Sequence, residues 1–598
     1  MAMKRALPRP HALLFLLPFG LLSCGGGGGS GGSMSPAPSP APSPAPSPAP
    51  SPSPAPGPFS VRSTSPTNGA TGVARTSGFT ATFSAPVNVG TVNATTAELI
   101  GPEGNVMPSS VSVNAADLTL APSTPGLPGN TAYTVRLAST IADTSGRVLG
   151  NAYSTSFTTA PQAWNVTSTI VASVAASTPG GAQPAAEADS LGNVTAVWHY
   201  NNPQANGTNP DTLFMARWDG HSGTWGLGGN FYEAAGASYI GNLSVLAGPN
   251  GDAYAIWMEG SVLKFARYSA AQNTWAFQQV SITPAGMIPD PPGPLVADSN
   301  GNLTVLTTGG TVGQIELFET TYNGASGTWS APAEILIPST FSGTTSINTQ
   351  GMAVDGQGNI TAAWYQSATL SEPLVATHYD AASGTWTPFQ QLDPNVSTGL
   401  YNTVSMALDP TGVVTIAWTH SGGLAGNPNA EVSRFDPSTA TWSASTQLDS
   451  GTGALGAGTP AVAVDPAGYA TVAWFQYEGV FASRFNPTTQ SWTAAQRVSA
   501  AGATPNSPAA VTADSAGNVT VVYVDGFSHR AVAIEYEVSG GQWLAPVMID
   551  TPSGGATPIF SNLPVTVSDP SGTVTAVWYA EDSAHGPSLD LLTANQFK

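Results

Sequence analysis

The 598-residue chain has a single cysteine, few charged residues and, beyond its N-terminus, no long apolar run. One cysteine excludes an internal disulfide, and the missing apolar run predicts no transmembrane helix in the body of the chain. Charged residues make up only 8% of the sequence, which disfavours long surface helices, because these are rich in Glu and Lys. The 66 Gly and 52 Pro residues instead favour many short strands joined by turns, in an all-β fold of several domains.

Basic residues are scarce: 15 Lys and Arg stand against 35 Asp and Glu, a net charge of −20. Nucleic-acid binding needs basic side chains that displace counterions from phosphates, so we expect no nucleic-acid partner. The same charge argues against broad adhesion to anionic lipid. Divalent cations and neutral ligands remain open.

Residues 1–24 have the layout of an export signal, with Lys4 and Arg5 before a short apolar stretch that ends at Leu21-Leu22-Ser23-Cys24. These four residues resemble the lipobox of bacterial lipoproteins, which implies lipidation of the Cys24 thiol and membrane attachment. Gly26, by the rule of that family, favours the outer membrane and the cell surface. An ordinary secretory signal with an unmodified thiol is the alternative.

Residues 25–58 are a glycine run followed by repeated Ser-Pro-Ala-Pro. This composition cannot form a core, and its proline-rich part should be extended polyproline II at about 3.1 Å per residue. We interpret it as a disordered stalk.

Residues 59–160 show short alternating segments such as Phe79-Thr80-Ala81-Thr82-Phe83, separated by turn residues. The pattern predicts a β-sandwich. Ser65–Val73, Phe83–Val87 and the Asp143–Gly146 turn resemble the bacterial Ig-like domain of S-layer proteins (the SbsA-like type). This resemblance implies a spacer or adhesion module, without catalytic residues.

Residues 161–598 repeat one phrase: an apolar strand, an acidic turn and a second strand that ends in an aromatic residue nine positions later, as in Asp189–Trp198. Only the copy that starts at Asp298 lacks the aromatic, having Thr307. The copies are 49 to 59 residues apart, the size of a four-stranded propeller blade. They begin at Asp189, Gly248, Asp298, Asp355, Asp409, Asp465, Asp514 and Asp569.

A second phrase lies between these copies, a strand ending in an aromatic residue, a turn and a tryptophan. Its tryptophans are Trp164, Trp225, Trp275, Trp329, Trp386, Trp442, Trp492 and Trp543. Because the last copy of the first phrase has no tryptophan strand after it, Ala163–Ile170 is predicted to complete the blade that contains Leu591–Phe597. We therefore predict an eight-bladed β-propeller closed by both its ends, without an unpaired sheet edge. Seven blades plus a stray unit is the alternative.

The first phrase resembles NHL repeats, and the second resembles the Asp-box hairpin of sialidases, although Asp380 precedes Trp386 by six residues where an Asp box has five. Both resemblances imply a fold and no particular activity. A sialidase site would need arginines at differing positions. Arginine here recurs at one strand position, which predicts a structural role, at Arg217, Arg267, Arg434 and Arg484.

The tryptophans and the acidic turns also have structural interpretations. The repeat accounts for 14 of the 15 tryptophans, all but Trp218, so packing between blades explains them without a ligand. A calcium ion needs six or more oxygens, whereas each Asp-x-x-Gly-Asn turn offers one carboxylate and matches a tight turn. We expect no metal site and no cofactor.

Ligand-binding residues are expected where the repeat is irregular, on the face formed by the loops between second and third strands. The candidates there are His199, Tyr200, Glu259, Tyr365, Gln366, His420, Gln476, Tyr477, Glu478 and Glu581. Polar residues at the start of channel-lining strands add Asn242, Asn348, Gln350, Asn402, Asn506 and Asn562. Such a set would suit a neutral glycan or a peptide; ordinary solvated loops are the alternative for each residue.

The function that these features favour is a monomeric, lipid-anchored cell-surface binding or adhesion protein. Catalysis is not favoured, because no Ser-His-Asp order, HExxH or Walker loop is present. An extracellular glycoside hydrolase or polysaccharide lyase remains an alternative, with Glu259 and Glu478 as a hypothetical acid–base pair. An envelope assembly scaffold is the third. The sequence identifies no ligand.

Overall fold

The computed structural model separates into two compact units, Met1–Gly57 and Pro58–Lys598. Every strand that the structure describes lies in the second unit, and no helix among the described residues is long and apolar enough to cross a bilayer. The predicted signal, Cys24 and the stalk up to residue 56 lie outside the described residues. These are residues 57–122, 126–175, 184–201, 211–226, 229–235, 240–284, 287–289, 293, 295–311, 314–335, 346–367, 373–393, 404–421, 428–449, 456–476, 478–505, 509–551, 558–582 and 589–598.

The N-terminal domain is a β-sandwich of two four-stranded sheets, in the orders β1-β3-β6-β5 and β2-β8-β7-β4. Alternation sets its core: Phe79, Ala81 and Phe83 on β3 are buried, and the threonines between them are half-buried. Its elements are β1 (Val61–Ser65), β2 (Ala70–Val73), β3 (Phe79–Phe83), η1 (Val89–Thr91), β4 (Ala97–Ile100), β5 (Ser109–Asn114), β6 (Asp117–Pro122), β7 (Ala132–Leu137) and β8 (Tyr153–Thr159).

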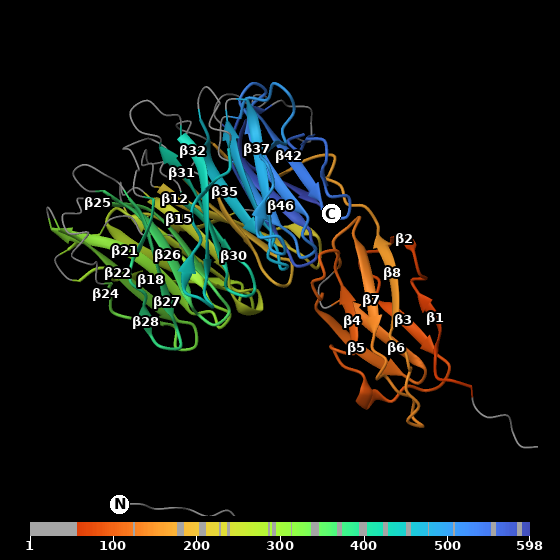
Figure 1. Ribbon diagram of the computed structural model, residues 1–598. Helices are drawn as coiled ribbons and strands as arrows, with labels where there is room; N and C mark the ends of the chain where they lie inside the picture. The colour runs from red at the N-terminus through yellow and green to blue at the C-terminus, as the bar shows by residue number, and fades with distance from the viewer. Residues whose placement is uncertain are drawn as a thin grey trace, which may run out of the picture. The chain divides into compact units, whose positions relative to one another are not determined.

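The rest of the chain is a β-propeller, whose described residues form eight antiparallel sheets (Figure 1). We number these blades in chain order. The first strands are β10 (Ala185–Ala188), β15 (Ile240–Ala247), β19 (Ile288–Pro289) with β20 (Val296–Ala297), β25 (Ser346–Val354), β30 (Val404–Leu408), β35 (Gly458–Val464), β40 (Ala510–Ala513) and β45 (Pro558–Ser568). The second strands are β11 (Val194–Asn201), β16 (Ala253–Glu259), β21 (Leu303–Thr311), β26 (Ile360–Ser367), β31 (Val414–Ser421), β36 (Ala470–Gln476), β41 (Val519–Asp525) and β46 (Val574–Asp582).

The outer half of each blade consists of a long third strand and a short or divided fourth strand. The third strands are β12 (Asp211–Asp219), β17 (Val262–Ser269), β22 (Gln314–Asn323), β27 (Leu374–Asp380), β32 (Pro428–Asp436), β37 (Gly479–Asn486), β42 (Arg530–Glu537) and β47 (Leu589–Phe597). The fourth are β13 (Thr224–Trp225) with β14 (Gly229–Glu233), β18 (Thr274–Val280), β23 (Thr328–Trp329) with β24 (Ala333–Ile335), β28 (Thr385–Trp386) with β29 (Gln390–Asp393), β33 (Thr441–Trp442) with β34 (Thr446–Gln447), β38 (Ser491–Trp492) with β39 (Gln496–Arg497), β43 (Gln542–Trp543) with β44 (Val547–Met548), and β9 (Thr169–Ala175). A short turn of helix, η2 (Pro249–Gly251), precedes β16.

Hydrophobic packing between blades holds the ring together. Eight clusters each combine buried residues of two neighbouring blades, and these pairs follow one another around the ring from blades 1 and 2 to blades 8 and 1. The aromatic residue of the second strand, present in seven of the eight copies, lies in one of them and is at most 3% exposed in each of these seven. The prediction that these tryptophans pack between blades is confirmed.

The second series of tryptophans pairs across strands inside each blade. Every member lies beside the aromatic residue of the third strand, with ring centroids 5.2 to 5.9 Å apart. In the eighth blade the partners are Trp164 and Phe597, which come from opposite ends of the propeller sequence. The same packing unit therefore recurs in all eight propeller sheets of the described residues.

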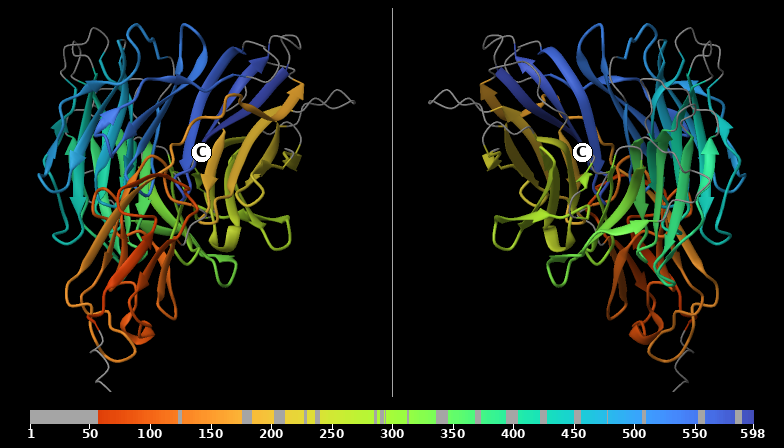
Figure 2. Two further views of the ribbon diagram at one scale, coloured as in Figure 1. Left: turned by 90° about the vertical axis from the view of Figure 1, so that its right-hand side faces the viewer. Right: turned by 90° about the vertical axis from the view of Figure 1, so that its left-hand side faces the viewer.

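Strands from both ends of the propeller sequence complete one blade, as predicted. Strand β9 pairs with β47 over Leu589–Leu592 and Thr593–Ala594, and Figure 2 shows the blue C-terminal strands beside the orange strand that follows the sandwich. The predicted range Ala163–Ile170 is only partly right. Trp164 forms an isolated bridge to Phe597 and the main ladder is Thr169–Ala175, because the fourth strand is divided here as it is in most blades.

The acidic turns are tight turns, as predicted. In the first blade one oxygen of Asp189 accepts the amide hydrogens of Leu191 and Asn193, and the other accepts from the Asn193 side chain. The same pattern recurs at Asp298, Asp355 and Asp514. Gly192, the fourth residue of the first turn, has a φ of 81°, a conformation that favours glycine. Among the described residues no group of three or more His, Cys, Asp or Glu side chains is placed to hold a metal ion.

Candidate functional site

The candidate residues of the irregular rim that the structure describes mostly link neighbouring blades. His420 of blade 5 lies 2.7 Å from Asp393, which is the last residue of β29 in blade 4 and also accepts the Trp418 indole N–H. Gln476 of blade 6 donates to Asp449 of blade 5 at 3.5 Å. The Tyr365 hydroxyl of blade 4 donates to the Thr419 carbonyl of blade 5. These side chains act as polar clamps between blades.

His199 forms a similar link between the first two blades. Its Nδ1 atom lies 3.1 Å from Asp211 of the same blade, and the other oxygen of Asp211 accepts the backbone N–H of Ile240 in blade 2. His199 is 8% exposed. A buried, paired imidazole in this position has a clear structural role.

Glu259 is buried and receives three donors. The Tyr232 hydroxyl and the Ala235 amide of blade 1 donate to its carboxylate, and Lys264 lies 3.5 Å away. Burial acts to raise the pKa of Glu259, but the Tyr232 and Ala235 hydrogen bonds outweigh it and lower that pKa. Glu259 is therefore ionised and suits a structural link better than a general acid. Glu478 is exposed in the turn between β36 and β37, on blade 6, so the ring separates this residue from Glu259 of blade 2.

Other rim candidates are placed only in part. The backbone of Tyr200, Gln366, Asn348, Gln350, Asn562 and Glu581 lies in strands, and their side chains are outside the described set, as are Tyr477, Asn402 and Asn506 entirely. The channel-lining asparagines coincide with strand irregularities: the register shifts at Asn242, between Asn348 and Gln350, and after Asn562. Asn242 has a φ of 52°, which suits an asparagine in a β-bulge.

Two candidate residues share a cavity beside the first strands of blades 1, 2 and 8. This space of about 450 Å³ is lined by His199, Asn242, Ser244 and mostly small or apolar residues such as Ala185 and Val565. His199 is held by Asp211, so few polar groups remain to orient a ligand. This cavity therefore offers few side chains that could hydrogen-bond to a ligand.

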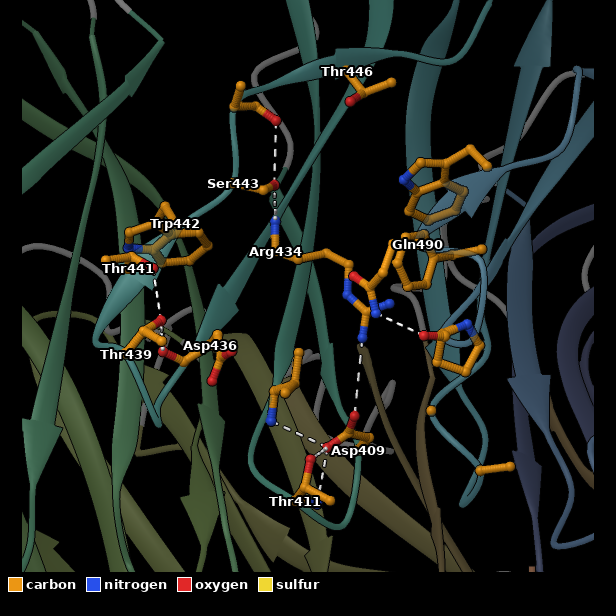
Figure 3. A pocket seen from close by; sticks show the side chains of 17 residues that line it. Asp409, Thr411, Arg434, Asp436, Thr439, Thr441, Trp442, Ser443, Thr446 and Gln490 are labelled. Carbon is orange, nitrogen blue, oxygen red and sulfur yellow. Dashed lines mark hydrogen bonds and ion pairs between the residues drawn. The ribbon is translucent and has the colours of Figure 1, made fainter. Parts of the chain in front are cut away.

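A second cavity, of about 550 Å³, lies between blades 5 and 6. We call it the blade 5–6 groove; Figure 3 shows it from close by. It is bounded by turns that join the first to the second and the third to the fourth strands, and so lies at the end of the propeller opposite the predicted rim. The groove has three aromatic residues, Trp442, Phe485 and Trp492, one cation, Arg434, and one amide, Gln490. Its hydroxyl groups belong to Thr411, Thr439, Thr441, Ser443 and Thr446.

Arg434 is the central polar residue of the groove. It extends from β32 toward Gln490 (Figure 3), and its guanidinium carbon lies 3.9 Å from the centroid of the Phe485 ring in blade 6. The closest carboxylate oxygen, on Asp409, is 3.9 Å from Nη2. Nη1 is buried and has no hydrogen-bond partner among the described residues. Burial also lowers the pKa of Arg434, which reflects loss of hydration of a cation that stays protonated.

The arginine at the same position of blade 1 has three acceptors within 2.8 Å. Arg217 donates to the Thr195 hydroxyl at 2.6 Å, to Asp189 at 2.8 Å and to the Gly251 carbonyl of blade 2 at 2.7 Å. In blade 5 the corresponding threonine, Thr415, is unpaired among the described atoms, like Nη1 of Arg434. The predicted structural role of the recurring arginines thus fits Arg217 and does not account for Arg434.

Sequence reasoning did not find this groove. Trp442, Trp492 and Arg434 belong to regular series and were interpreted as packing, and in residue type nothing separates Arg434 from Arg217. The one difference lies in the aromatic ring of the next blade. Arg217 faces Tyr268, which has a hydroxyl, whereas Arg434 faces Phe485, which has none.

Comparisons with known proteins identify the family of the N-terminal domain. The Bacterial Ig-like domain family matches residues 55–159, and no curated protein matches the chain. Among solved structures, the Dos1 propeller is 10% identical, with 72% of this chain and 95% of that chain covered and a TM-score of 0.40. The polysaccharide lyase Uly1 is 8% identical (67% and 87% covered, TM-score 0.38), and the NanB sialidase from Streptococcus pneumoniae 10% (90% and 92%, TM-score 0.33). The family match thus identifies the sandwich as a bacterial Ig-like domain, and likenesses as distant as those to these three structures carry no argument.

Proposed function

We propose that this protein is a cell-surface binding protein whose propeller holds a glycan in the blade 5–6 groove. The observation that carries the proposal is the combination of two half-buried tryptophans with a cation, an amide and hydroxyls in one cavity: Trp442 and Trp492 beside Arg434 and Gln490. Pyranose rings stack on aromatic faces through their C–H groups, and polar side chains around such a platform fix the orientation of the hydroxyls.

Binding is favoured over turnover because the groove's carboxylates are already engaged. One oxygen of Asp409 accepts the amides of Thr411 and Val413, and Asp436 accepts the hydroxyl and the amide of Ser438. The Ser438 hydrogen bonds lower the pKa of Asp436. A glycosidase needs one carboxyl that stays protonated as general acid, and Asp436, with its lowered pKa, does not suit that role.

The proposal includes the surface location. The lipobox-like sequence before Cys24 would supply an outer-membrane lipid anchor, residues 25–58 a stalk, and the Ig-like sandwich a spacer. A Cys24→Ser variant should lose incorporation of radiolabelled palmitate and leave the membrane fraction, while the wild-type protein stays in it. Retention of the label by the variant would exclude Cys24 as the anchor.

A glycan array with the full chain tests the binding function. Trp442→Ala and Trp492→Ala should each weaken binding of the best glycan by about tenfold or more, because stacking on one aromatic ring is worth roughly 0.5–1.5 kcal/mol beyond its buried area. Trp225→Ala is the matched control, since Trp225 is the equivalent residue of blade 1, outside the groove. Equal loss in the control, or binding untouched by both groove variants, would refute the site.

The protein used for the glycan array should also be incubated with each polysaccharide that it binds, and cleavage of the polysaccharide should be measured. Cleavage that a rim Glu→Gln variant abolishes would favour the alternative of a glycoside hydrolase or lyase. A stoichiometric envelope protein recovered with the chain, without glycan binding, would favour an assembly scaffold.

A further inference from the structure

Arg484 is the counterpart of Arg434 in the following blade, and a carboxylate from the sandwich fills the space beside it. Arg484 of blade 6 receives the carboxylate of Glu103, which the sandwich inserts from the hairpin between β4 and β5, at 2.7 Å from Nη2. The sandwich and the propeller belong to one compact unit, and Asn105 anchors the same hairpin by donating to the Ser515 carbonyl at 2.7 Å. The Glu103 side chain is 8% exposed, so its carboxylate fills the space between blades 6 and 7.

The two sites correspond residue by residue. Arg484 and Arg434 occupy the same position of the third strand, opposite Thr471 and Thr415. Each guanidinium lies over the aromatic ring of the next blade, Tyr536 at 4.8 Å for Arg484 and Phe485 at 3.9 Å for Arg434. Each arginine comes later in the chain than the aspartate of its own blade's acidic turn, which is Asp465 for Arg484 and Asp409 for Arg434.

The difference between the two sites is the acceptor. Arg484 donates from Nη2 both to Asp465, at 2.8 Å, and to Glu103. Arg434 is 3.9 Å from Asp409, and its Nη1 has no acceptor within the described structure. A buried guanidinium with an unused donor is unfavourable until an oxygen ligand arrives, and a carboxylate is the acceptor that matches its planar donors best.

We infer that the ligand of the blade 5–6 groove carries a carboxylate, which Arg434 receives as Arg484 receives that of Glu103, and that this ligand is a hexuronic acid residue of an acidic glycan. The inference rests on the proposed function and names the sugar class. The five hydroxyl side chains and the two half-buried tryptophans of the groove favour a uronic acid over an acidic peptide, because they match a pyranose ring with several hydroxyls. Asp465 opposes the charge of Glu103, because burial and this aspartate together raise the pKa of the Glu103 carboxyl to about 8 although Arg484 lowers it. Asp409, 3.9 Å from Arg434, would oppose the charge of a ligand carboxylate in the same way.

Calorimetric titration of the full chain tests the inference. The probes are trisaccharides of galacturonic, glucuronic and mannuronic acid, their carboxyl-reduced neutral counterparts, and a tetraglutamate peptide. The wild-type protein should bind at least one uronate trisaccharide about tenfold or more tightly than its neutral counterpart. Arg434→Gln should abolish that preference, and Arg434→Lys should retain the charge but lose much of it, because the paired donors are gone. Arg267→Gln, at the equivalent arginine of blade 2, is the control and should keep it.

Each outcome bears on one claim. Equal binding of acidic and neutral sugars by the wild type, with loss in Trp442→Ala, would overturn the carboxylate inference and leave the glycan site intact. Uronate binding unchanged in both Arg434 variants would also overturn it. Preference for tetraglutamate that depends on Arg434 would replace the sugar with an acidic peptide. Binding that no Trp442 or Trp492 variant alters would instead refute the proposed function.

Discussion

The free energy of unfolding of the propeller should fall as the pH rises from about 4.5 to 8, and Glu535 should be a main cause. Glu535 of blade 7 is 8% exposed and accepts the Trp164 indole N–H at 3.0 Å and the Thr520 hydroxyl. Burial raises its pKa to about 8 from an ordinary value of 4.5. The folded protein thus retains a proton that the unfolded chain releases in this range.

The sign and size follow from proton linkage. The stabilisation is fully present below the unfolded pKa and is lost as the pH rises through the folded pKa. A rise of this size corresponds to at most about 5 kcal/mol, or about 1.4 kcal/mol per pH unit. For a domain of this size that is about 1–2 °C in Tm per unit. Burial also raises the pKa of Glu187 to about 7 and that of Asp514 to about 6, which steepens the slope.

Scanning calorimetry of wild type and Glu535→Gln at pH 5.5, 6.5 and 7.5 measures the effect. The amide can accept from Trp164 and donate to the Thr520 hydroxyl, so the variant should match wild type at pH 5.5 and unfold at a higher temperature at pH 7.5. Glu334→Gln, a change at an exposed strand residue, should keep the wild-type slope. A wild-type Tm that does not fall with pH, or an equal slope in Glu535→Gln, would refute the reasoning.

Three further predictions follow from the clamps, the charge and the closing pair. Asp393→Ala should lower stability by about 2–4 kcal/mol, because it removes the acceptor of Trp418 and His420, whereas Asp393→Asn should lower it less; denaturant titration compares them. A long polyuronate should bind more tightly as salt rises from 20 to 200 mM, because salt screens its repulsion from a chain with a net charge of −20. A uronate trisaccharide should not show this rise, and a fall in the affinity for the polymer would contradict the prediction. Trp164→Phe should keep the ring contact with Phe597 but lose the hydrogen bond to Glu535, at about 1–3 kcal/mol; a Tm equal to wild type at pH 7.5 would contradict it.

The repeat made much of the fold predictable. The interval between repeats and the fixed position of the aromatic residues within each repeat predicted the sheets, the buried tryptophans and a blade shared by both ends of the propeller sequence. Each of these features depends on contacts that recur at fixed intervals. The turn role of Asp189 and its equivalents was predictable for the same reason, since the acceptors of each carboxylate lie within four residues.

The groove was not predictable, because it depends on distances between blades. Arg434 and Arg217 are identical in type and position, and only the separation from the turn aspartate, 3.9 Å against 2.8 Å, distinguishes an under-paired arginine from a paired one. The rim candidates fail as a ligand set for a related reason. The sequence shows no partner for His420 and Gln476, but in the fold Asp393, at the end of β29, and Asp449, just after β34, reach them from the preceding blade.

The blade shared by β9 and β47 also sets a condition on how the native state is reached. Until Leu589–Phe597 is available, the edge of Thr169–Ala175 has no partner and the gap in the circle exposes blades 1 and 7 to water. A nascent or clipped chain that lacks those nine residues can form individual sheets, yet it presents two open edges to any neighbouring chain. Chaperones and proteases that act before the last strand is added would therefore meet an incomplete ring with unpaired strand edges and exposed apolar residues. After β47 has paired with β9, those edges and residues are covered.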